Sequence, residues 1–395
     1  MIPESALIAT FWFACCGTVY AYVGFPALVG LLAGMRRPRF VNCERKGAHL
    51  PVTIIIPAYN EERSIEAKIR NVLAAEYPRE LLDVLVVSDA STDSTDDIAR
   101  SFGADGVRLV VQNRRRGKTA GLNRAIERAR GDLVVFTDAN ATYQPDTIDT
   151  LAGHFDDPKV GLVTGYTLYV TTGSGEVAQA TNAYTSLERV IKAAESRWGC
   201  CVGADGAIFA MRRSLYRPLR DDDINDFVIP LGVIEQGYRC VFAEDAWCAE
   251  RPGKSVESEF RRQARITNRT LRALWRHAHL LNPVRFGMFS FFLFSHKLVR
   301  FFVPILLMLG AVSLALLART GGVYLFAVVF ATVVVTLAAA ARSKPSAVSP
   351  WSLPGRLLYF LNVFLTINLA VLQGWWNFLC GRRDVTWQHD RSQVV

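Results

Sequence analysis

Short apolar runs alternate with amphipathic segments along the middle of the chain. The apolar runs, rich in Val, Ile and Leu, cover residues 52–57, 84–88, 109–111 and 133–136. The segments between them have the spacing of helices with one apolar face and cover residues 64–75, 94–102 and 118–130. This β-α-β-α-β-α-β order predicts an α/β domain with a mostly parallel sheet covered by helices. Ligands of such sheets bind beyond the carboxyl ends of the strands.

Four other apolar runs are long enough to cross a membrane, since about 20 apolar residues span a bilayer. They cover residues 6–34, 301–318, 321–341 and 357–380. The basic segment 36–39 directly follows the first run and places that end in the cytoplasm. Four spans then put the C-terminus outside, although arginines in the tail 382–395 favour the inside. Either one C-terminal run is re-entrant or interfacial, or the tail is an exception.

A further segment, residues 269–298, predicts helices that lie in the membrane interface. Leu271, Leu274 and Trp275 fall at helical spacing among basic residues, and residues 286–294 are rich in phenylalanine. We therefore expect a multi-pass protein of the cell (inner) membrane with a cytoplasmic α/β domain. The predicted parts are an N-terminal span with its basic flank (1–40), the α/β domain (41–268), interfacial helices (269–298), C-terminal spans (299–381) and a tail (382–395).

Composition narrows the class of protein. The chain has 45 Lys and Arg against 36 Asp and Glu, a net charge of +9, and 51% of its residues are hydrophobic, which excludes a disordered or collagen-like chain. The basic excess is interpreted as local patches, and no nucleic-acid partner is expected. The eight cysteines contain no C-x-x-C pair and the six histidines no H-x-x-x-H pair, so neither a zinc site nor a disulfide framework is predicted. His277 and His279 are interpreted as ordinary residues beside a basic helix.

Polar residues stand at the ends of the predicted strands. They are the segment 57–62 after the first strand, Asp89 after the second, Gly117 and Lys118 before the third helix, and Asp138 with Asn140 after the fourth strand. The chain has neither G-x-G-x-x-G after the first strand nor a complete G-x-x-x-x-G-K-[ST] motif, which argues against a dehydrogenase and an ATPase.

This set of side chains favours a nucleotide diphosphate bound partly through a divalent metal, Mg or Mn. An acid at a strand end repels phosphate unless a cation lies between them. Asp138 is the natural first metal ligand, and Asn140, two residues on, points the same way along an extended chain. Each residue also has a simpler role open to it: Asp138 and Asn140 in a turn, Asp89 as a helix cap, and Lys118 as a solvated helix residue.

Four motifs together resemble a known family. They are IPAYNEE at 56–62, VSDASTD at 87–93, GKTAGLN at 117–123 and FTDAN at 136–140. They look like the nucleotide-sugar half of the family-2 inverting glycosyltransferases, and the membrane layout is similar to that of cellulose, chitin, hyaluronan and poly-N-acetylglucosamine synthases. The resemblance covers residues 51–265 and implies a GT-A-like nucleotide-sugar-binding domain.

The resemblance implies a role for each matching residue on the donor side. Ala58, Tyr59 and Glu61 match positions around the uracil and ribose of a UDP-sugar. Asp89 matches the carboxylate that reads the base, and Lys118 matches the cation near the diphosphate. Asp138 and Asn140 match the D-x-D metal motif, with Asn in place of the last acid.

Three later segments match the acceptor side of the family. GADGAIFA at 203–210 resembles the acceptor-side glycine segment, with Gly203, Asp205 and Gly206 near the acceptor. INDFVIP at 224–230 lies where the family carries its catalytic acid, which makes Asp226 the candidate base. Among the neighbouring acids 221–223, Asp223 is the one most easily confused with it.

The third segment, RQARI at 262–266, keeps part of the Q-x-x-R-W pattern of processive members. Arg262 and Ile266 replace its Gln and Trp, while Arg265 keeps a guanidinium suited to a diphosphate. Trp198 is an alternative stacking residue, or a core tryptophan.

Three functions are compatible with the sequence. The first is transfer from a UDP-sugar to a growing cell-surface polysaccharide. The second is a single transfer to a lipid carrier or glycolipid, favoured by the altered Q-x-x-R-W pattern. The third is a non-catalytic membrane component that binds the nucleotide as a sensor. The expected partners are the donor, a saccharide or lipid-linked acceptor, and membrane lipids.

Overall fold

The computed structural model describes residues 2–35, 47–170, 176–251, 256–343 and 353–383. The chain forms two compact units. The sheet unit contains residues 29–253 and 269–292, and the helical unit contains residues 1–28, 254–268 and 293–382. The basic segment 36–39 and nearly all of the predicted tail lie outside the described residues.

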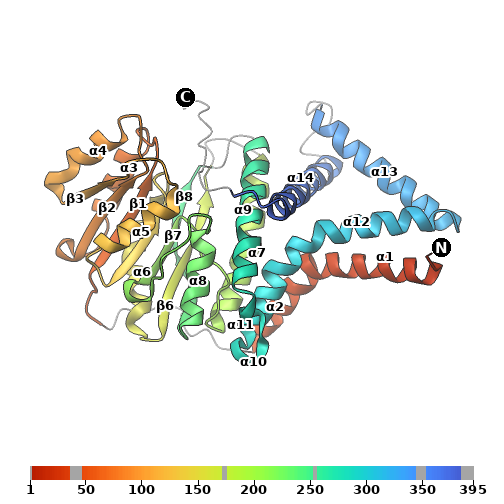
Figure 1. Ribbon diagram of the computed structural model, residues 1–395, viewed down its shortest axis with the longest axis horizontal. Helices are drawn as coiled ribbons and strands as arrows, with labels where there is room; N and C mark the ends of the chain where they lie inside the picture. Colours follow the sequence, from red (N-terminus) through yellow and green to blue (C-terminus); the bar gives the residue numbers. More distant parts are fainter. Residues whose placement is uncertain (1, 36–46, 171–175, 252–255, 344–352, 384–395) are drawn as a thin grey trace. The chain divides into compact units, whose positions relative to one another are not determined.

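An eight-stranded sheet organises the sheet unit (Figure 1). Its strands are β1 Val52–Ala58, β2 Leu82–Ser88, β3 Val107–Val111, β4 Leu133–Thr137, β5 Thr142–Tyr143, β6 Val160–Tyr169, β7 Ile208–Arg212 and β8 Arg239–Glu250. They lie in the order β3-β2-β1-β4-β7-β6-β8-β5. Strands β1 to β4 are parallel, as predicted. Strand β7 is antiparallel to both β4 and β6, so the later half of the sheet is mixed.

Helices pack on the sheet because its strands are apolar on both faces. The helices of this unit include α3 Ile65–Leu73, α4 Thr95–Ser101, α5 Lys118–Arg128, α6 Thr147–Gly153, α7 Glu176–Arg197 and α8 Asn225–Glu235. Ile54 and Ile56 of β1 share one core with Ile65 and Ile69 of α3. The alternate strand residues face the other way, where a Cβ on Gly121 of α5 would lie 3.2 Å from Val87.

The helical unit contains the predicted membrane spans. Its helices are α1 Glu4–Val19, which continues through the π-helical turn Tyr20–Gly24 into the start of α2 Phe25–Gly34, α12 Val299–Leu317, α13 Gly322–Ser343 and α14 Leu353–Leu379. From Val29 onward α2 belongs to the sheet unit. A hydrogen bond of 2.8 Å joins the Tyr20 hydroxyl to the Ser295 hydroxyl. The Trp375 ring nitrogen donates to the Phe301 carbonyl at 2.8 Å. All four predicted apolar runs are therefore helical.

Two helices among the described residues are long and apolar enough to cross a bilayer, Glu4–Gly34 and Met288–Leu317. A third apolar helix, Gly322–Leu337, is shorter. The last helix, α14, carries amides that bond within it: Asn368 donates to the Phe364 carbonyl and Gln373 to Asn377. Such pairing lowers the cost of placing amides in lipid. Four spans stay a prediction, with two supported by length and composition.

The segment expected at the membrane interface is largely helical, and its place in a membrane stays a prediction. A single helix, α9 Val256–Arg276, runs across the expected boundary at residue 268. It is followed by the 3₁₀ turn Ala278–Leu281 and by α10 Pro283–Phe286 and α11 Met288–Phe292. Leu271 and Leu274 are 4% and 5% exposed, whereas Trp275 is 78% exposed. The apolar face of this segment therefore packs largely against protein, which leaves Trp275 and a few neighbours for a membrane surface.

Candidate active site

The predicted donor-site residues share one edge of the sheet. From β1 the chain proceeds through β2 to β3 on one side, and then returns to β4 on the other side of β1. The order of parallel strands therefore reverses between β1 and β4, where open α/β sheets bind ligands beyond the strand ends. Tyr59 directly follows β1 and Asp138 directly follows β4.

Two residues at these strand ends have a backbone conformation that is uncommon without glycine. Asn60 has a φ of 55° and Ala90 a φ of 58°. The Asn60 side chain accepts a hydrogen bond of 2.8 Å from the Thr92 amide, and the Asn60 amide donates to the Ser91 hydroxyl at 3.1 Å. The loops after β1 and β2 thus hold each other in a strained form, which is common at functional sites.

Glu61 continues the loop after β1 and is 9% exposed. Its carboxylate accepts a hydrogen bond of 2.5 Å from the Ser64 hydroxyl, and its amide donates to the Thr95 hydroxyl at 2.8 Å. The residue therefore holds the turn that precedes α3 and connects it to α4. Its contact with a ribose stays a prediction.

Asp89 holds the loop that leads into α5. Its carboxylate accepts three hydrogen bonds, from the Gln112 side chain at 2.8 Å and from the amides of Arg116 and Gly117 at 2.7 and 2.8 Å. It is 4% exposed. The observed role of Asp89 is thus to support this loop. Its contact with the nucleotide base stays a prediction.

The same loop brings cations to the strand edge. Lys118 is the first residue of α5, after Gly117 with a φ of 89°. Its ammonium group lies 2.5 Å from the Asp138 carboxylate, and both side chains are partly exposed, at 17% and 28%. The two residues predicted to meet the diphosphate and the metal are therefore in contact.

Three arginines in this loop were missed in the sequence. Arg114, Arg115 and Arg116 directly precede Gly117, and the Arg115 guanidinium covers the Tyr59 ring at 3.9 Å. The run of basic residues beside Gly117 and Lys118 was the available signal. These charges and the N-terminus of α5 form a positive rim suited to a diphosphate.

Side chains of helix α3 bind the backbone of the segment that follows Asp138. The buried Lys68 ammonium donates to the Ala141 carbonyl at 2.7 Å and lies 3.8 Å from the centre of the Tyr143 ring. The Asn71 side chain exchanges two hydrogen bonds with the Tyr143 backbone. Lys68 and Asn71 therefore fix the chain directly after the predicted metal motif, and neither was identified in the sequence.

Burial lowers the pKa of Lys68 to about 7, and the nearby acids oppose the shift only in part. Because the unfolded chain binds this proton more tightly, Lys68 should contribute a free energy of unfolding that rises with pH between about 7 and 10, by up to about 1.4 kcal/mol per pH unit. Lys68→Met should remove this contribution, which denaturant unfolding measures best between pH 7 and 8, below the range in which the buried cysteines and tyrosines titrate in the unfolded chain. The exposed Lys159→Met is the control and should keep it; equal slopes in both variants would contradict the assignment.

On the acceptor side, Gly206 lies against Asp226. A Cβ added to Gly206 would lie 3.0 Å from the Asp226 carboxylate, and the Ala204 amide donates to the Asp226 carbonyl at 2.8 Å. Asp226 stands in the first turn of α8, where the helix dipole stabilises an anion. The glycine segment with Gly203 and the candidate base, predicted separately, are therefore adjacent.

This contact allows a specific test. In Gly206→Ala the methyl group should displace the Asp226 carboxylate by a few tenths of an ångström and lower kcat by about tenfold or more. Gly232→Ala in α8 is the matched control, because a Cβ there meets nothing within 4 Å. Turnover and thermal unfolding of both variants check the prediction. Normal turnover by Gly206→Ala would remove the argument that Asp226 needs this position.

Asp205 and Asp223 are engaged in structural contacts. The Asp205 carboxylate accepts from the Thr167 amide and hydroxyl at 3.0 and 2.8 Å, and from the Ala207 amide at 3.2 Å. Asp223, whose side chain is 6% exposed, forms an ion pair with Arg276. Asp205 therefore supports the loop beside β6, and Asp223 anchors the loop before α8, which distinguishes it from Asp226.

The remaining predicted residues lie elsewhere in the chain. Arg262 pairs with Glu259 at 3.3 Å, and Arg265 lies on the same helix α9, in the part that belongs to the helical unit. Trp198 follows α7 and is partly exposed. Ala58 ends β1 and is buried, and Asn140 is exposed beside Asp138. Their contacts with substrates or metal stay predictions.

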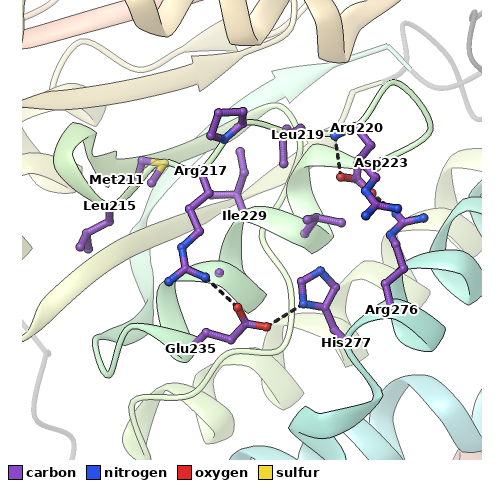
Figure 2. A pocket seen from close by; sticks show the side chains of 13 residues that line it. Met211, Leu215, Arg217, Leu219, Arg220, Asp223, Ile229, Glu235, Arg276 and His277 are labelled. Atoms are coloured by element: carbon purple, nitrogen blue, oxygen red, sulfur yellow. Dashed lines mark hydrogen bonds and ion pairs between the residues drawn. The ribbon is translucent and has the colours of Figure 1, made fainter.

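A pocket of about 270 Å³ lies beside α8 (Figure 2). Apolar side chains such as Leu215 and Ile229 line it together with Arg217, Glu235 and His277. Of the predicted site residues, all of which the structure describes, none lines this pocket.

Comparison with known proteins shows which family the sheet unit resembles. Residues 53–220 match the family described as Glycosyl transferase family 2. Over these residues the chain is similar to that family. The matched residues cover strands β1 to β4 and the loops with Tyr59, Asp89, Lys118 and Asp138, so the predicted donor edge lies among them.

A solved structure extends the likeness beyond these residues. The mannosyltransferase PcManGT from Pyrobaculum calidifontis, in complex with GDP-Man and Mn²⁺, is 25% identical. The match covers 95% of this chain and 100% of that one with a TM-score of 0.71. The predicted GT-A-like fold with an added helical region is confirmed.

Curated relatives match about half of this chain. The probable glycosyltransferase YdaM of Bacillus subtilis (strain 168) is 26% identical over 54% of this chain and 54% of its own length. The poly-beta-1,6-N-acetyl-D-glucosamine synthase of Staphylococcus aureus (strain COL) is 27% identical over 50% of this chain and 49% of its own length. The chain thus spans about half the length of the curated relatives it matches.

Proposed function

We propose that this protein is a membrane-bound, metal-dependent inverting glycosyltransferase that moves a sugar from a nucleoside diphosphate to a saccharide acceptor. The observation that carries the proposal is the contact of Lys118 with Asp138 at the reversal of strand order, beside the arginine-rich loop 114–116. The Asp138 carboxylate can bind a divalent cation, and the neighbouring basic side chains can bind the diphosphate oxygens. The similarity to family 2 supports the reaction class.

Asp138 and Asn140 would hold the metal. The site offers one partly exposed carboxylate and one exposed amide, which are oxygen donors. Mg²⁺ and Mn²⁺ sites of this kind use one or two protein oxygens and are completed by substrate phosphates and water. When bound, the metal neutralises charge on the leaving diphosphate. The Mn²⁺ in the mannosyltransferase structure supports this assignment.

In the proposed reaction Asp226 is the general base. The acceptor hydroxyl oxygen attacks the anomeric carbon as the bond from that carbon to the diphosphate breaks, and the hydroxyl proton passes to the Asp226 carboxylate. Lys118 and the arginine-rich loop then stabilise the departing nucleoside diphosphate. Gly206 leaves room beside Asp226 for the acceptor, since any side chain there would contact the carboxylate.

The donor class is proposed as a UDP-sugar from the family motifs around Tyr59 and Asp89. The mannosyltransferase structure contains GDP-Man, so GDP-sugars are the competing donors. Purified protein supplied with Mg²⁺ or Mn²⁺ and a panel of UDP- and GDP-sugars decides between them by the nucleotide released. Release of neither nucleotide, with tight binding of one, would favour the non-catalytic sensor instead.

The acceptor is proposed as a growing cell-surface polysaccharide, with transfer on the cytoplasmic face of the cell (inner) membrane. The poly-N-acetylglucosamine synthase relative and the apolar helices Glu4–Gly34 and Met288–Leu317 support this proposal. A second candidate, one transfer to a lipid carrier, is favoured by Arg262 and Ile266 in place of Gln and Trp. Product length separates them, because a ladder of oligomers requires polymerisation and one lipid-linked product requires single transfer.

A further inference from the structure

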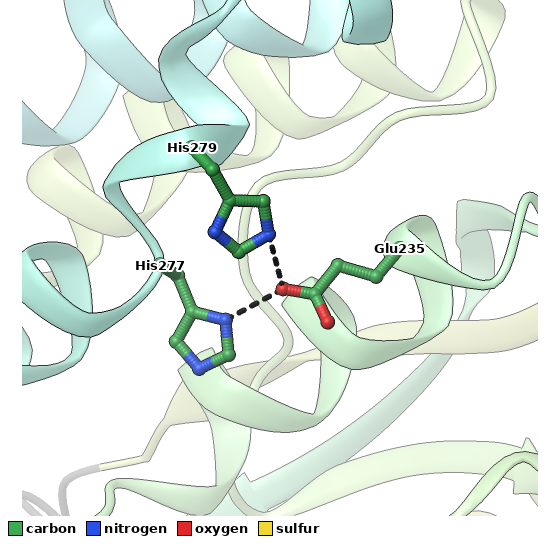
Figure 3. A group of neighbouring side chains, drawn as sticks. All are labelled: Glu235, His277 and His279. Atoms are coloured by element: carbon green, nitrogen blue, oxygen red, sulfur yellow. Dashed lines mark hydrogen bonds and ion pairs between the residues drawn. The ribbon is translucent and has the colours of Figure 1, made fainter.

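A cluster of possible metal ligands lies outside the donor edge, at the opposite end of α8 from Asp226. Figure 3 shows Glu235, the last residue of α8, facing His277 and His279 from the turn after α9. One carboxylate oxygen of Glu235 lies 2.7 Å from Nδ1 of His277 and 3.0 Å from Nε2 of His279. The three potential ligand atoms all lie within 4.8 Å of one another.

The second oxygen of Glu235 is held by a separate partner. It lies 3.0 Å from the Arg217 guanidinium (Figure 2), which orients the carboxylate and leaves the first oxygen toward the two histidines. Such outer contacts are typical of metal-binding carboxylates. The positive charge of Arg276, adjacent to His277 in the chain, is offset by its ion pairs with Asp222 and Asp223.

Access and burial also fit a metal ion. The Glu235 and His277 side chains are 14% and 22% exposed, whereas His279 is 50% exposed. Glu235 and His277 line the pocket beside α8, so a hydrated ion can approach them. In a tetrahedral zinc site the ligand atoms are about 3.3 Å apart, so the two oxygen–nitrogen distances of 2.7 and 3.0 Å would lengthen by about 0.3 to 0.6 Å when an ion binds.

We propose that Glu235, His277 and His279 bind one Zn²⁺ ion per chain. Two imidazoles and one carboxylate are ligands that favour zinc and other late first-row metals over Mg²⁺. The site goes beyond glycosyl transfer and does not depend on it, because Asp226 and Glu235 are separated by about 14 Å along the helix. The bound ion would tie the end of α8 to the turn after α9, as the ion pair between Asp223 and Arg276 does at the other end.

Zinc titration of the full-length protein in detergent tests the site. The titration contains excess Mg²⁺ to fill oxygen-ligand sites, and Co²⁺ is used in parallel for its visible absorption in a four-coordinate site. The parent should bind one Zn²⁺ per chain and melt at a higher temperature with zinc. His277→Ala and His279→Ala should weaken zinc binding by at least tenfold, and the Co²⁺ band should disappear.

Two controls make the result specific. His49→Ala removes another histidine–carboxylate pair, with Asp149 at 3.2 Å, and should leave zinc binding unchanged. Asp138→Ala should also leave it unchanged. The half-exposed His279 is the variant that should fold normally, which melting without zinc verifies. Equal zinc affinity in the parent and His279→Ala would overturn the proposal as adventitious binding, and loss of zinc in Asp138→Ala would assign the ion to the donor edge.

Discussion

Asp226→Asn is expected to lower kcat by about 10²- to 10⁴-fold, the usual contribution of a general base. Asparagine keeps the size of the side chain beside Gly206 but cannot accept the acceptor proton. Donor binding should change little, because the donor edge is built from Tyr59, Lys118 and Asp138. The measurement is nucleotide release from the donor at saturating acceptor, together with donor affinity.

A neighbouring acid provides the control for Asp226. Asp221 is exposed in the loop before α8, with its carboxylate 3.9 Å from Arg116. Asp221→Asn should keep turnover within about twofold, as is usual for weak surface ion pairs. If Asp226→Asn turned over like the parent, the base would have to be a different group.

Asp138→Ala is expected to lower kcat/KM by about 10²- to 10³-fold, comparable with the loss of other charge-stabilising groups. The variant removes the proposed metal ligand and the carboxylate paired with Lys118. Turnover should therefore lose most of its dependence on Mn²⁺ concentration. Lys118→Met separates the two effects, because it removes the ammonium group and leaves the carboxylate for the metal.

Asn140→Asp serves as the converse experiment. It restores the second acid of the D-x-D pattern at an exposed position, so the Mn²⁺ concentration needed for half-maximal turnover should fall. Unchanged metal dependence in both Asp138→Ala and Asn140→Asp would place the metal elsewhere.

Much of the donor edge was predictable because neighbouring parallel strands end at the same side of a sheet. Apolar runs located β1, β2 and β4 to within about two residues, and the polar residues after them had to meet. Lys118 and Asp138 are in contact for this reason. The sequence was less informative about which of the predicted acidic residues have a structural role. The carboxylates of Asp89 and Asp205 each accept three hydrogen bonds, most of them from residues far away in the sequence.

For the helical segments, too, the sequence predicted the elements but not their packing. Length and hydropathy predicted four helices, and each is present. The amphipathic pattern around Leu271 indicated a buried face. It did not indicate whether lipid or protein covers that face, because apolar side chains are favoured against both. Only the tertiary structure showed that Leu271 and Leu274 are buried by protein.

By itself, the sequence determined the α/β class, the family motifs and the residues at the strand ends, because these depend on periodicity and on spacing over a few residues. Only the tertiary structure showed that Lys68 contacts the segment after Asp138. It also showed that Glu235 contacts His277 and His279. These contacts join residues 73 and about 40 positions apart. Spacing rules for metal ligands compare near neighbours in the chain, whereas an ion requires only that ligand atoms meet in space.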